Sequence, residues 1–190
     1  ALTKELALQA GMAVPDLYGV IAHQADVKRF GSIVDDKDSF VIKPAQGSGG
    51  DGIFVITGRS SRKRDSFKLS SGMLISEGEL QHHISNIVSG QYSLSGNRDK
   101  ALIEYCVHFE PTFSEVSYQG VPDIRLIVFK GFPVMAMLRC ATEASDGKAN
   151  LHQGAVGIGV NIATGNALRA VQFDLPITIH PDTGVDLTKV

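Results

Sequence analysis

The 190-residue chain has no tryptophan, only two cysteines and almost no net charge. Two cysteines cannot build a disulfide framework, and Cys106 and Cys140 both lie in apolar, strand-like segments. We therefore expect two buried free thiols, which favours a reducing, cytoplasmic compartment. A formal charge of -2 and a pI of about 6.3 argue against a nucleic-acid partner and against a polybasic membrane-binding surface.

Long apolar runs are also absent. No stretch reaches the length of a membrane span, and the first fifteen residues lack the basic and apolar segments of an export signal. We therefore expect no membrane partner. A chain of 190 residues buries about 70% of its unfolded surface, so neither a disulfide nor a structural metal is needed for folding.

Glycine and β-branched residues are abundant, and together they predict a sheet-rich protein with tight turns. A capping box at Ser76 and Glu79 predicts a helix over residues 76–89, and a shorter helix is predicted over residues 3–10. Residues 58–71 are basic and polar, and we expect a mobile surface excursion there. Strands are predicted at residues 39–44, 53–57, 101–107, 123–129, 134–140, 155–162 and 167–173. This order predicts an α+β fold with mainly antiparallel sheets.

The stretch F-V-I-K-P-A-Q-G-S-G-G-D-G-I-F-V-I, residues 40–56, carries a G-x-G-x-x-G spacing. A dinucleotide fold needs a helix after the last glycine, but a β run follows Gly52. A Walker A loop needs Lys and Ser/Thr after that glycine, and a kinase needs a later-strand lysine and H-R-D. Two interpretations stay open: a phosphate-covering hairpin preceded by Lys43, or a plain glycine-rich hairpin whose lysine extends to solvent.

Four motifs in order, K-P-x-x-G-S-G-G-D-G-I, I-E-Y, D-I-R-x-x-V and L-R-x…N-L-H-x-G, resemble the ATP-grasp superfamily. Within it the chain is most similar to the RimK-type alpha-L-glutamate ligases and their relatives, some of which are associated with sugar transfer. The resemblance covers nearly the whole chain and implies two small lobes around a nucleotide cleft. Residues 1–38 would be a junction from a preceding domain, 39–105 the small lobe and 106–190 a truncated large lobe.

The resemblance also implies site residues. Lys43 would contact the ATP phosphates beneath the glycine-rich loop, and Glu110 is a possible ribose contact. Arg125 and Arg139 would hold the transferred phosphoryl group or a carboxylate, with Asn150 and His152 lining the same site. The loop would comprise Gly47, Ser48, Gly49, Gly50 and Gly52, and the adenine hinge Glu104, Tyr105, Cys106 and Val107.

Several of these residues also have purely structural explanations. Glu104 could pair with a lysine at a sheet edge, and Asp123 with Arg125 could form a surface pair. Asn150 could be a turn residue and His152 an interfacial histidine. The remaining polar clusters, His82–His83 and Arg62-Lys63-Arg64, read as solvated rather than as ligand sites.

The implied chemistry is ATP-dependent carboxylate activation. An acylphosphate forms, and an amine then displaces phosphate. The expected partners are ATP and a small carboxylate or peptide, and a homo-oligomer is a candidate assembly. The alternative is a non-catalytic nucleotide-binding or regulatory module. The family binds Mg²⁺ through an Asp and a Glu-x-Asn, but no E-x-N occurs in the later half. We read Asp186 as an imitation of the first motif, expect the metal ligands beyond residue 190, and expect the chain to be an internal fragment.

Overall fold

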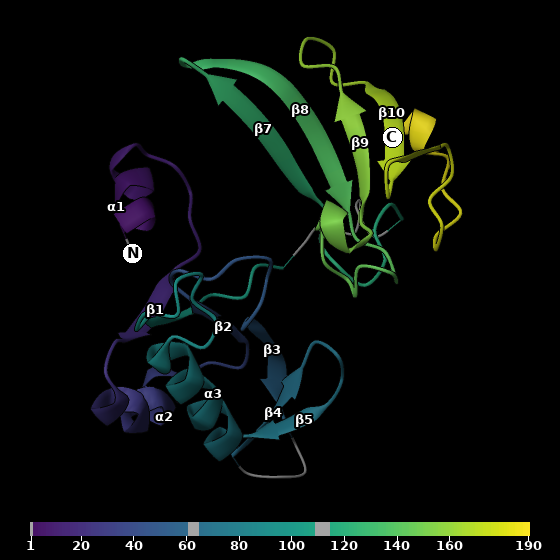
Figure 1. Cartoon of the computed structure of the whole chain (residues 1–190). Helices are drawn as coiled ribbons and strands as arrows, with labels where there is room; N and C mark the ends of the chain where they lie inside the picture. Colours follow the sequence, from purple (N-terminus) through teal and green to yellow (C-terminus); the bar gives the residue numbers. More distant parts are fainter. Residues whose placement is uncertain (1, 61–64, 109–114) are drawn as a thin grey trace. The chain divides into compact units, whose positions relative to one another are not determined.

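The structure is a computed structural model that describes residues 2–60, 65–108 and 115–190 (Figure 1). The chain forms two compact units, Ala1–Val107 and His108–Val190. Both contain an antiparallel sheet, and helices are few, so the predicted α+β class with mainly antiparallel pairing is confirmed.

The first unit is built on a six-stranded sheet in the order β1-β6-β2-β3-β4-β5, in which every pair is antiparallel. These strands are β1 (Leu17–Ile21), β2 (Phe40–Pro44), β3 (Phe54–Arg59), β4 (Ser66–Leu69), β5 (Leu74–Ser76) and β6 (Ala101–Glu104). The helices of this unit are α1 (Leu2–Gln9), η1 (Gln24–Arg29), α2 (Phe30–Ile33) and α3 (Glu77–Ser89). Part of the segment expected to be a junction therefore contributes β1, which pairs with β6.

Helix α3 begins and ends as its sequence predicts. The Ser76 hydroxyl accepts from the Glu79 amide at 3.3 Å, and the Ser76 amide donates to the Glu79 carboxylate at 2.8 Å. Gly90 ends the helix in the left-handed region, at φ 95°. The inner face packs into the main core of the unit, which includes Phe40, Ile42, Ile56, Leu80, Ile84, Ile87, Val88 and Ile103.

The expectation of a mobile excursion over residues 58–71 is wrong for the residues described there. Strand β3 continues to Arg59, and β4 begins at Ser66 and pairs with it. Arg59 ties this hairpin to the end of α2, because its guanidinium donates to the carbonyls of Val34, Asp35 and Lys37. The Arg62-Lys63-Arg64 run lies outside the described residues.

The second unit is a five-stranded antiparallel sheet in the order β11-β10-β9-β8-β7. Its elements are β7 (Asp123–Phe129), β8 (Phe132–Cys140), η3 (Leu151–Gln153), β9 (Val156–Val160), β10 (Ala167–Gln172), β11 (Leu175–Ile177) and η4 (Leu187–Lys189). The strands predicted at residues 123–129 and 134–140 form the β7–β8 hairpin, and those predicted at 155–162 and 167–173 form the β9–β10 hairpin. The β7–β8 turn places Lys130 at φ 48° and Gly131 at φ 87°, the positive values that a two-residue hairpin turn requires.

Both cysteines are free and buried, as predicted, one in each unit. Within the described part of the chain, no helix is long and apolar enough to cross a membrane.

Candidate functional site

Lys43 and Glu104 lie on neighbouring strands of the first sheet. Strands β2 and β6 pair with Val41 opposite Glu104 and Lys43 opposite Leu102. Strand alternation turns Ile42 and Ile103 into the core that α3 covers, so Lys43 and Glu104 share the other face. There the Lys43 ammonium forms an ion pair with Glu104 Oε1. The structure thus brings together two residues that the resemblance assigns separately to phosphate and adenine.

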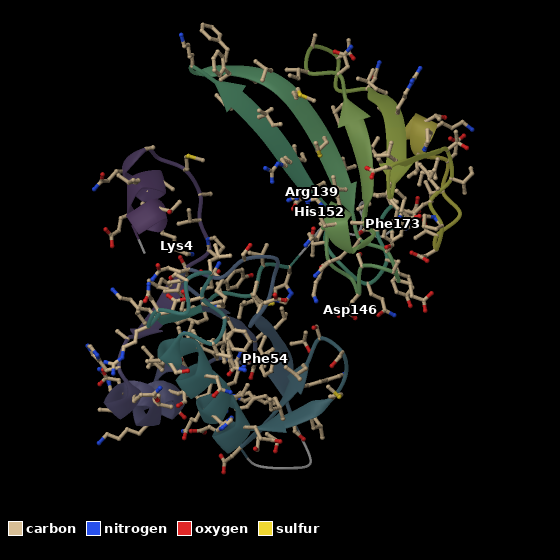
Figure 2. The ribbon with its side chains drawn as sticks, in the orientation of Figure 1. Lys4, Phe54, Arg139, Asp146, His152 and Phe173 are labelled. Atoms are coloured by element: carbon tan, nitrogen blue, oxygen red, sulfur yellow. The ribbon has the colours of Figure 1, made fainter. Side chains whose placement is uncertain are left out.

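The Glu104 carboxylate is almost fully buried, with a side-chain exposure of 4%, and it has a second cation beside it. Lys4 Nζ, from helix α1 (Figure 2), lies 2.7 Å from Glu104 Oε2 and donates to the Pro15 carbonyl at 2.5 Å. The Lys4 contact is close enough for an ion pair, yet Oε2 accepts no hydrogen bond of good geometry from the described residues. A buried charge is costly unless paired, so two ammonium groups account for an ionised Glu104 in this position.

The structural alternative for Glu104, pairing with a lysine, is therefore observed, but not at a sheet edge, because β6 lies between β1 and β2. Lys4 was not identified from the sequence. Local pattern carries no signal for it, since its partner is far along the chain, although T-K-E-L belongs to the segment covered by the resemblance.

The glycine-rich loop joins β2 to β3 as a hairpin connection. Gly49, Gly50 and Gly52 have φ values of 67°, 85° and 75°, in the left-handed region that residues with a side chain rarely adopt. Within the loop the Asp51 amide donates to the Ser48 carbonyl at 3.2 Å. This hydrogen bond closes a turn within the loop.

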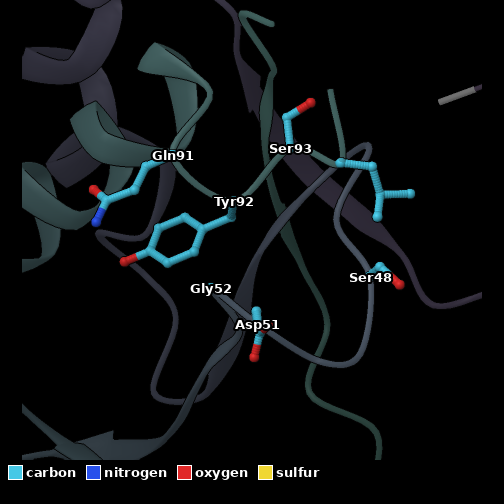
Figure 3. Close-up of a pocket in the computed structure, with 7 residues that line it drawn as sticks. Ser48, Asp51, Gly52, Gln91, Tyr92 and Ser93 are labelled. Carbon is cyan, nitrogen blue, oxygen red and sulfur yellow. The ribbon is translucent and has the colours of Figure 1, made fainter. Parts of the chain in front are cut away.

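Close packing also fixes the first glycine of the loop. A Cβ on Gly47 would lie 2.4 Å from Pro44 Cγ, so a side chain there would clash with the end of β2. A cavity of about 410 Å³ opens on the loop (Figure 3). It is lined by Ser48, Asp51, Gly52, Gln91, Tyr92, Ser93 and Leu94. Lys43 and Glu104 do not line this cavity. They are candidate ligand contacts because of their charges and their ion pair, and the cavity is not part of that argument.

The predicted hinge begins with Glu104, the last residue of β6. The Tyr105 amide donates at 2.8 Å to the carbonyl of Asp16, the residue before β1, so this amide is not directed at a ligand. Cys106 is buried, and burial raises the pKa of its thiol, whereas Val107 is exposed. Glu110, the candidate ribose contact, lies outside the described residues.

In the second unit, Arg139 is held by Asp123 across the β7–β8 pair. The two residues are directly opposite in register, and the guanidinium donates twice to the carboxylate, from Nε and from a terminal nitrogen, both at 2.6 Å. The predicted Asp123–Arg125 surface pair is therefore replaced by an Asp123–Arg139 pair. Arg125 is exposed on β7, opposite Met137.

Asn150 and His152 lie together at η3. The Asn150 side-chain oxygen accepts from the His152 amide at 3.2 Å and caps this short helix, which is the structural alternative considered for Asn150. The His152 side chain is exposed. Asp186 likewise caps η4: hydrogen bonds from Thr188 and Lys189 lower the pKa of its carboxyl to about 2.

One histidine was misjudged from the sequence. His82 is exposed on α3, but His83 is buried with 5% exposure, so the pair is not solvated as expected. The spacing 80, 83, 84, 87 would have placed His83 on the inner face of the helix. Among the residues that the structure describes, no three His, Cys, Asp or Glu side chains cluster to hold a metal ion.

Comparison with known proteins places these features in a family. The family model described as "Sugar-transfer associated ATP-grasp" matches residues 1–190, the whole chain. No curated protein and no solved structure gives a significant match. A glycine-rich hairpin after a strand lysine, a buried strand-end glutamate and two antiparallel sheets agree with that match. The chain belongs to the sugar-transfer associated ATP-grasp family.

Proposed function

We propose that the first unit binds ATP, with Lys43 at the phosphates, the glycine-rich loop over them and Glu104 at the adenine. The observation that carries the proposal is the ion pair between the buried Glu104 and the partly exposed Lys43, on the strand that leads into the glycine-rich hairpin. A glutamate buried on a sheet face is costly, and a site that must recognise a ligand gives a reason for keeping it there.

The residues present fit a nucleotide. Glu104 Oε2 accepts no hydrogen bond of good geometry from the described residues, and its neighbour is Lys4 Nζ at 2.7 Å. An exocyclic amine at this oxygen would take the place of Lys4. Lys43 is 32% exposed, so its ammonium has access to a ligand while one side faces Glu104. The positive-φ glycines let backbone amides of the loop approach an anion closely.

For the reaction, we propose ADP-forming ligation in which a carboxylate attacks the terminal phosphoryl group of ATP and an amine then displaces phosphate from the acylphosphate. Such a transfer between anions needs fixed positive charge. Arg125 and Arg139 are the candidates. A guanidinium has five N–H donors, and Asp123 takes two of those on Arg139, so it orients the side chain and leaves donors for an anion.

The side chains of the described residues do not support a Mg²⁺ site. The family binds the metal through clustered acidic and amide oxygens, and the described residues contain no cluster of three His, Cys, Asp or Glu side chains. No step of the proposed reaction is therefore assigned to a metal held by these residues.

The acceptor class has two candidates. The resemblance to RimK-type enzymes favours glutamate or a peptide amine, whereas the family description, sugar-transfer associated ATP-grasp, favours a substrate linked to sugar transfer. ADP release by the natural full-length protein with each class of carboxylate and amine distinguishes them. AMP instead of ADP would contradict the acylphosphate route, and ATP binding with no turnover in any combination would support a regulatory module.

The nucleotide site is tested by titrating the chain with ATP and Mg²⁺. Lys43→Ala is expected to raise the Kd for ATP by about tenfold or more, because a charge-assisted hydrogen bond contributes about 1.5 to 3 kcal/mol. The matched control is Lys68→Ala, which removes an exposed lysine from β4 of the same sheet. Equal affinities for Lys43→Ala and the unmodified chain, both folded by circular dichroism, would remove Lys43 from the phosphate site.

A further inference from the structure

The end of the glycine-rich loop contacts a buried histidine. His83 Nε2 lies 2.9 Å from the Gly52 carbonyl oxygen. Since a carbonyl oxygen only accepts, Nε2 carries the proton and donates. The other ring nitrogen, Nδ1, is 3.5 Å from the Tyr92 hydroxyl, which is a suitable donor to it. The neutral imidazole therefore satisfies both of its neighbours.

The imidazole is also held by its faces. It stacks on the Phe54 ring with centroids 3.7 Å apart and planes 2° apart, and the centroid of the Tyr92 ring lies 5.4 Å away. Figure 2 labels Phe54. Burial lowers the pKa of His83, with smaller effects from the Gly52 hydrogen bond, which raises it, and from His82. Phe54 is the first residue of β3, so the stack fixes the histidine at the point where the loop enters the strand.

Gly52 also packs closely against the Tyr92 ring, which contacts His83. A Cβ built on Gly52 would lie 2.6 Å from the Tyr92 ring, and the φ of 75° already disfavours a side chain (Figure 3). Tyr92 follows α3 by three residues, and His83 lies within α3. Gly52 is therefore contacted by two side chains, His83 from α3 and Tyr92 from the turn that follows this helix.

The other end of the loop has its own anchor. The Gln46 amide donates to Asp99 Oδ2 at 2.9 Å, and Asp99 is 3% exposed. Between these anchors, Ser48, Gly49 and Asp51 are exposed, and Ser48 and Asp51 line the 410 Å³ cavity rather than a packed core. The middle of the loop is thus exposed, whereas both of its ends are hydrogen-bonded to other segments of the unit.

We propose that His83 is a positioning residue that fixes the Gly52 end of the glycine-rich loop, so that closure over a phosphate ligand is confined to residues 48–51. The anchor follows from contacts within the first unit alone. Only its purpose, closing over phosphates, rests on the proposed function.

The anchor is tested by amide hydrogen exchange on the chain without nucleotide. His83→Phe keeps a flat ring for the Phe54 stack but loses the donor to Gly52. Exchange of the peptide covering residues 47–54 is expected to become about fivefold faster, the factor for one net hydrogen bond. His83→Gln, whose amide nitrogen approximates the position of Nε2, is expected to restore most of the protection. His82→Phe, one residue away and exposed, is the matched control and should leave the peptide unchanged.

A peptide covering residues 101–104 of β6 reports whether His83→Phe has loosened the whole unit. If this peptide also exchanges faster, the comparison is made on His83→Gln and on the ratio of loop to β6 rates. Loop exchange that is the same in His83→Phe and the unmodified chain would overturn the proposal. So would a loop and a β6 peptide that accelerate by the same factor in both His83 variants.

The purpose of the anchor is tested by adding ATP and Mg²⁺. Protection is expected at residues 48–51 in the unmodified chain, and His83→Phe should raise the Kd for ATP about fivefold while His82→Phe does not. If Lys43→Ala binds ATP normally but His83→Phe still frees the loop, the proposed nucleotide site fails and the anchor stands. If Lys43→Ala weakens ATP and His83→Phe changes neither exchange nor Kd, the anchor fails and the site stands.

Discussion

The two sheets share an antiparallel design but differ in how completely their apolar side chains are covered. In the first unit, large side chains such as Phe30, Phe40 and Phe67 are buried to within 1% and stack edge to face. In the second unit, the β7–β8 hairpin leaves Phe129 and Phe132 at 65% and 73% exposure. Further exposed apolar residues on it are Ile124, Leu126, Val128, Val134 and Met135.

The difference extends to the charged residues of the candidate site. In the Lys43–Glu104 pair the carboxylate is 4% exposed. In the Asp123–Arg139 pair the carboxylate is 45% exposed. Burial makes the first pair sensitive to any missing partner, and solvent screens the second. The same type of ion pair should therefore contribute very differently in the two units.

The largest expected effect comes from truncating one phenylalanine in each unit, a buried one in the first and an exposed one in the second. Phe40→Ala should lower the free energy of unfolding of the first unit by about 3 to 5 kcal/mol, since a fully buried phenylalanine leaves a cavity. Phe129→Ala in the second unit should change it by no more than about 0.5 kcal/mol. Urea unfolding followed by hydrogen exchange of each unit measures both. A comparable loss for Phe129→Ala would mean that the hairpin is covered in solution.

The next effect concerns the ion pairs. Glu104→Ala leaves Lys4 and Lys43 without their shared carboxylate. It should lower the free energy of unfolding of the first unit by about 3 kcal/mol, because removing the buried partner of an ion pair leaves the remaining charge uncompensated. Asp123→Ala should cost at most about 1 kcal/mol, since that carboxylate is partly exposed. Thermal unfolding at low and high salt separates them, with salt reducing only the effect of Asp123→Ala. Equal costs would show that burial does not distinguish the pairs.

The smallest effect is a pH dependence that both units share. Burial lowers the pKa of His83 in the first unit and of His180 in the second below the ordinary 6.5, so the unfolded chain binds protons more readily than the folded one. Stability should therefore be complete above about pH 6.5 and fall as the pH drops below it. His83→Phe should flatten this slope for the first unit only, as unfolding midpoints between pH 5 and 7.5 would report. An unchanged slope would mean that His83 is not neutral in the folded unit.

Local pattern predicted most of the fold. The capping box of α3 and the strands that form both hairpins of the second unit follow from spacings within a few residues, and they are present. Strand β1 was missed because Gly19 interrupts a short run, and β5 and β11 because each has only three residues.

The candidate site was predictable residue by residue but not as an arrangement. Lys43 and Glu104 are prominent in their own segments, yet only strand pairing between β2 and β6 brings them together. Lys4 and the Asp123–Arg139 pair depend on contacts between distant segments, for which a single sequence has no signal. His83 differs, because it shares the helical spacing of Leu80, Ile84 and Ile87, which are buried on the same face of α3.

The two cysteines have a practical consequence. Cys106 belongs to the first unit and Cys140 to the second; burial raises the pKa of both thiols, and that of Cys140, with help from Asp123, reaches about 11. Because the thiolate is the reactive form, each sulfur should resist alkylation until its own unit opens. Each unit thus contains one native cysteine whose alkylation rate reports how often that unit opens. The rates at the two positions would measure the opening of the two units separately, without an introduced probe.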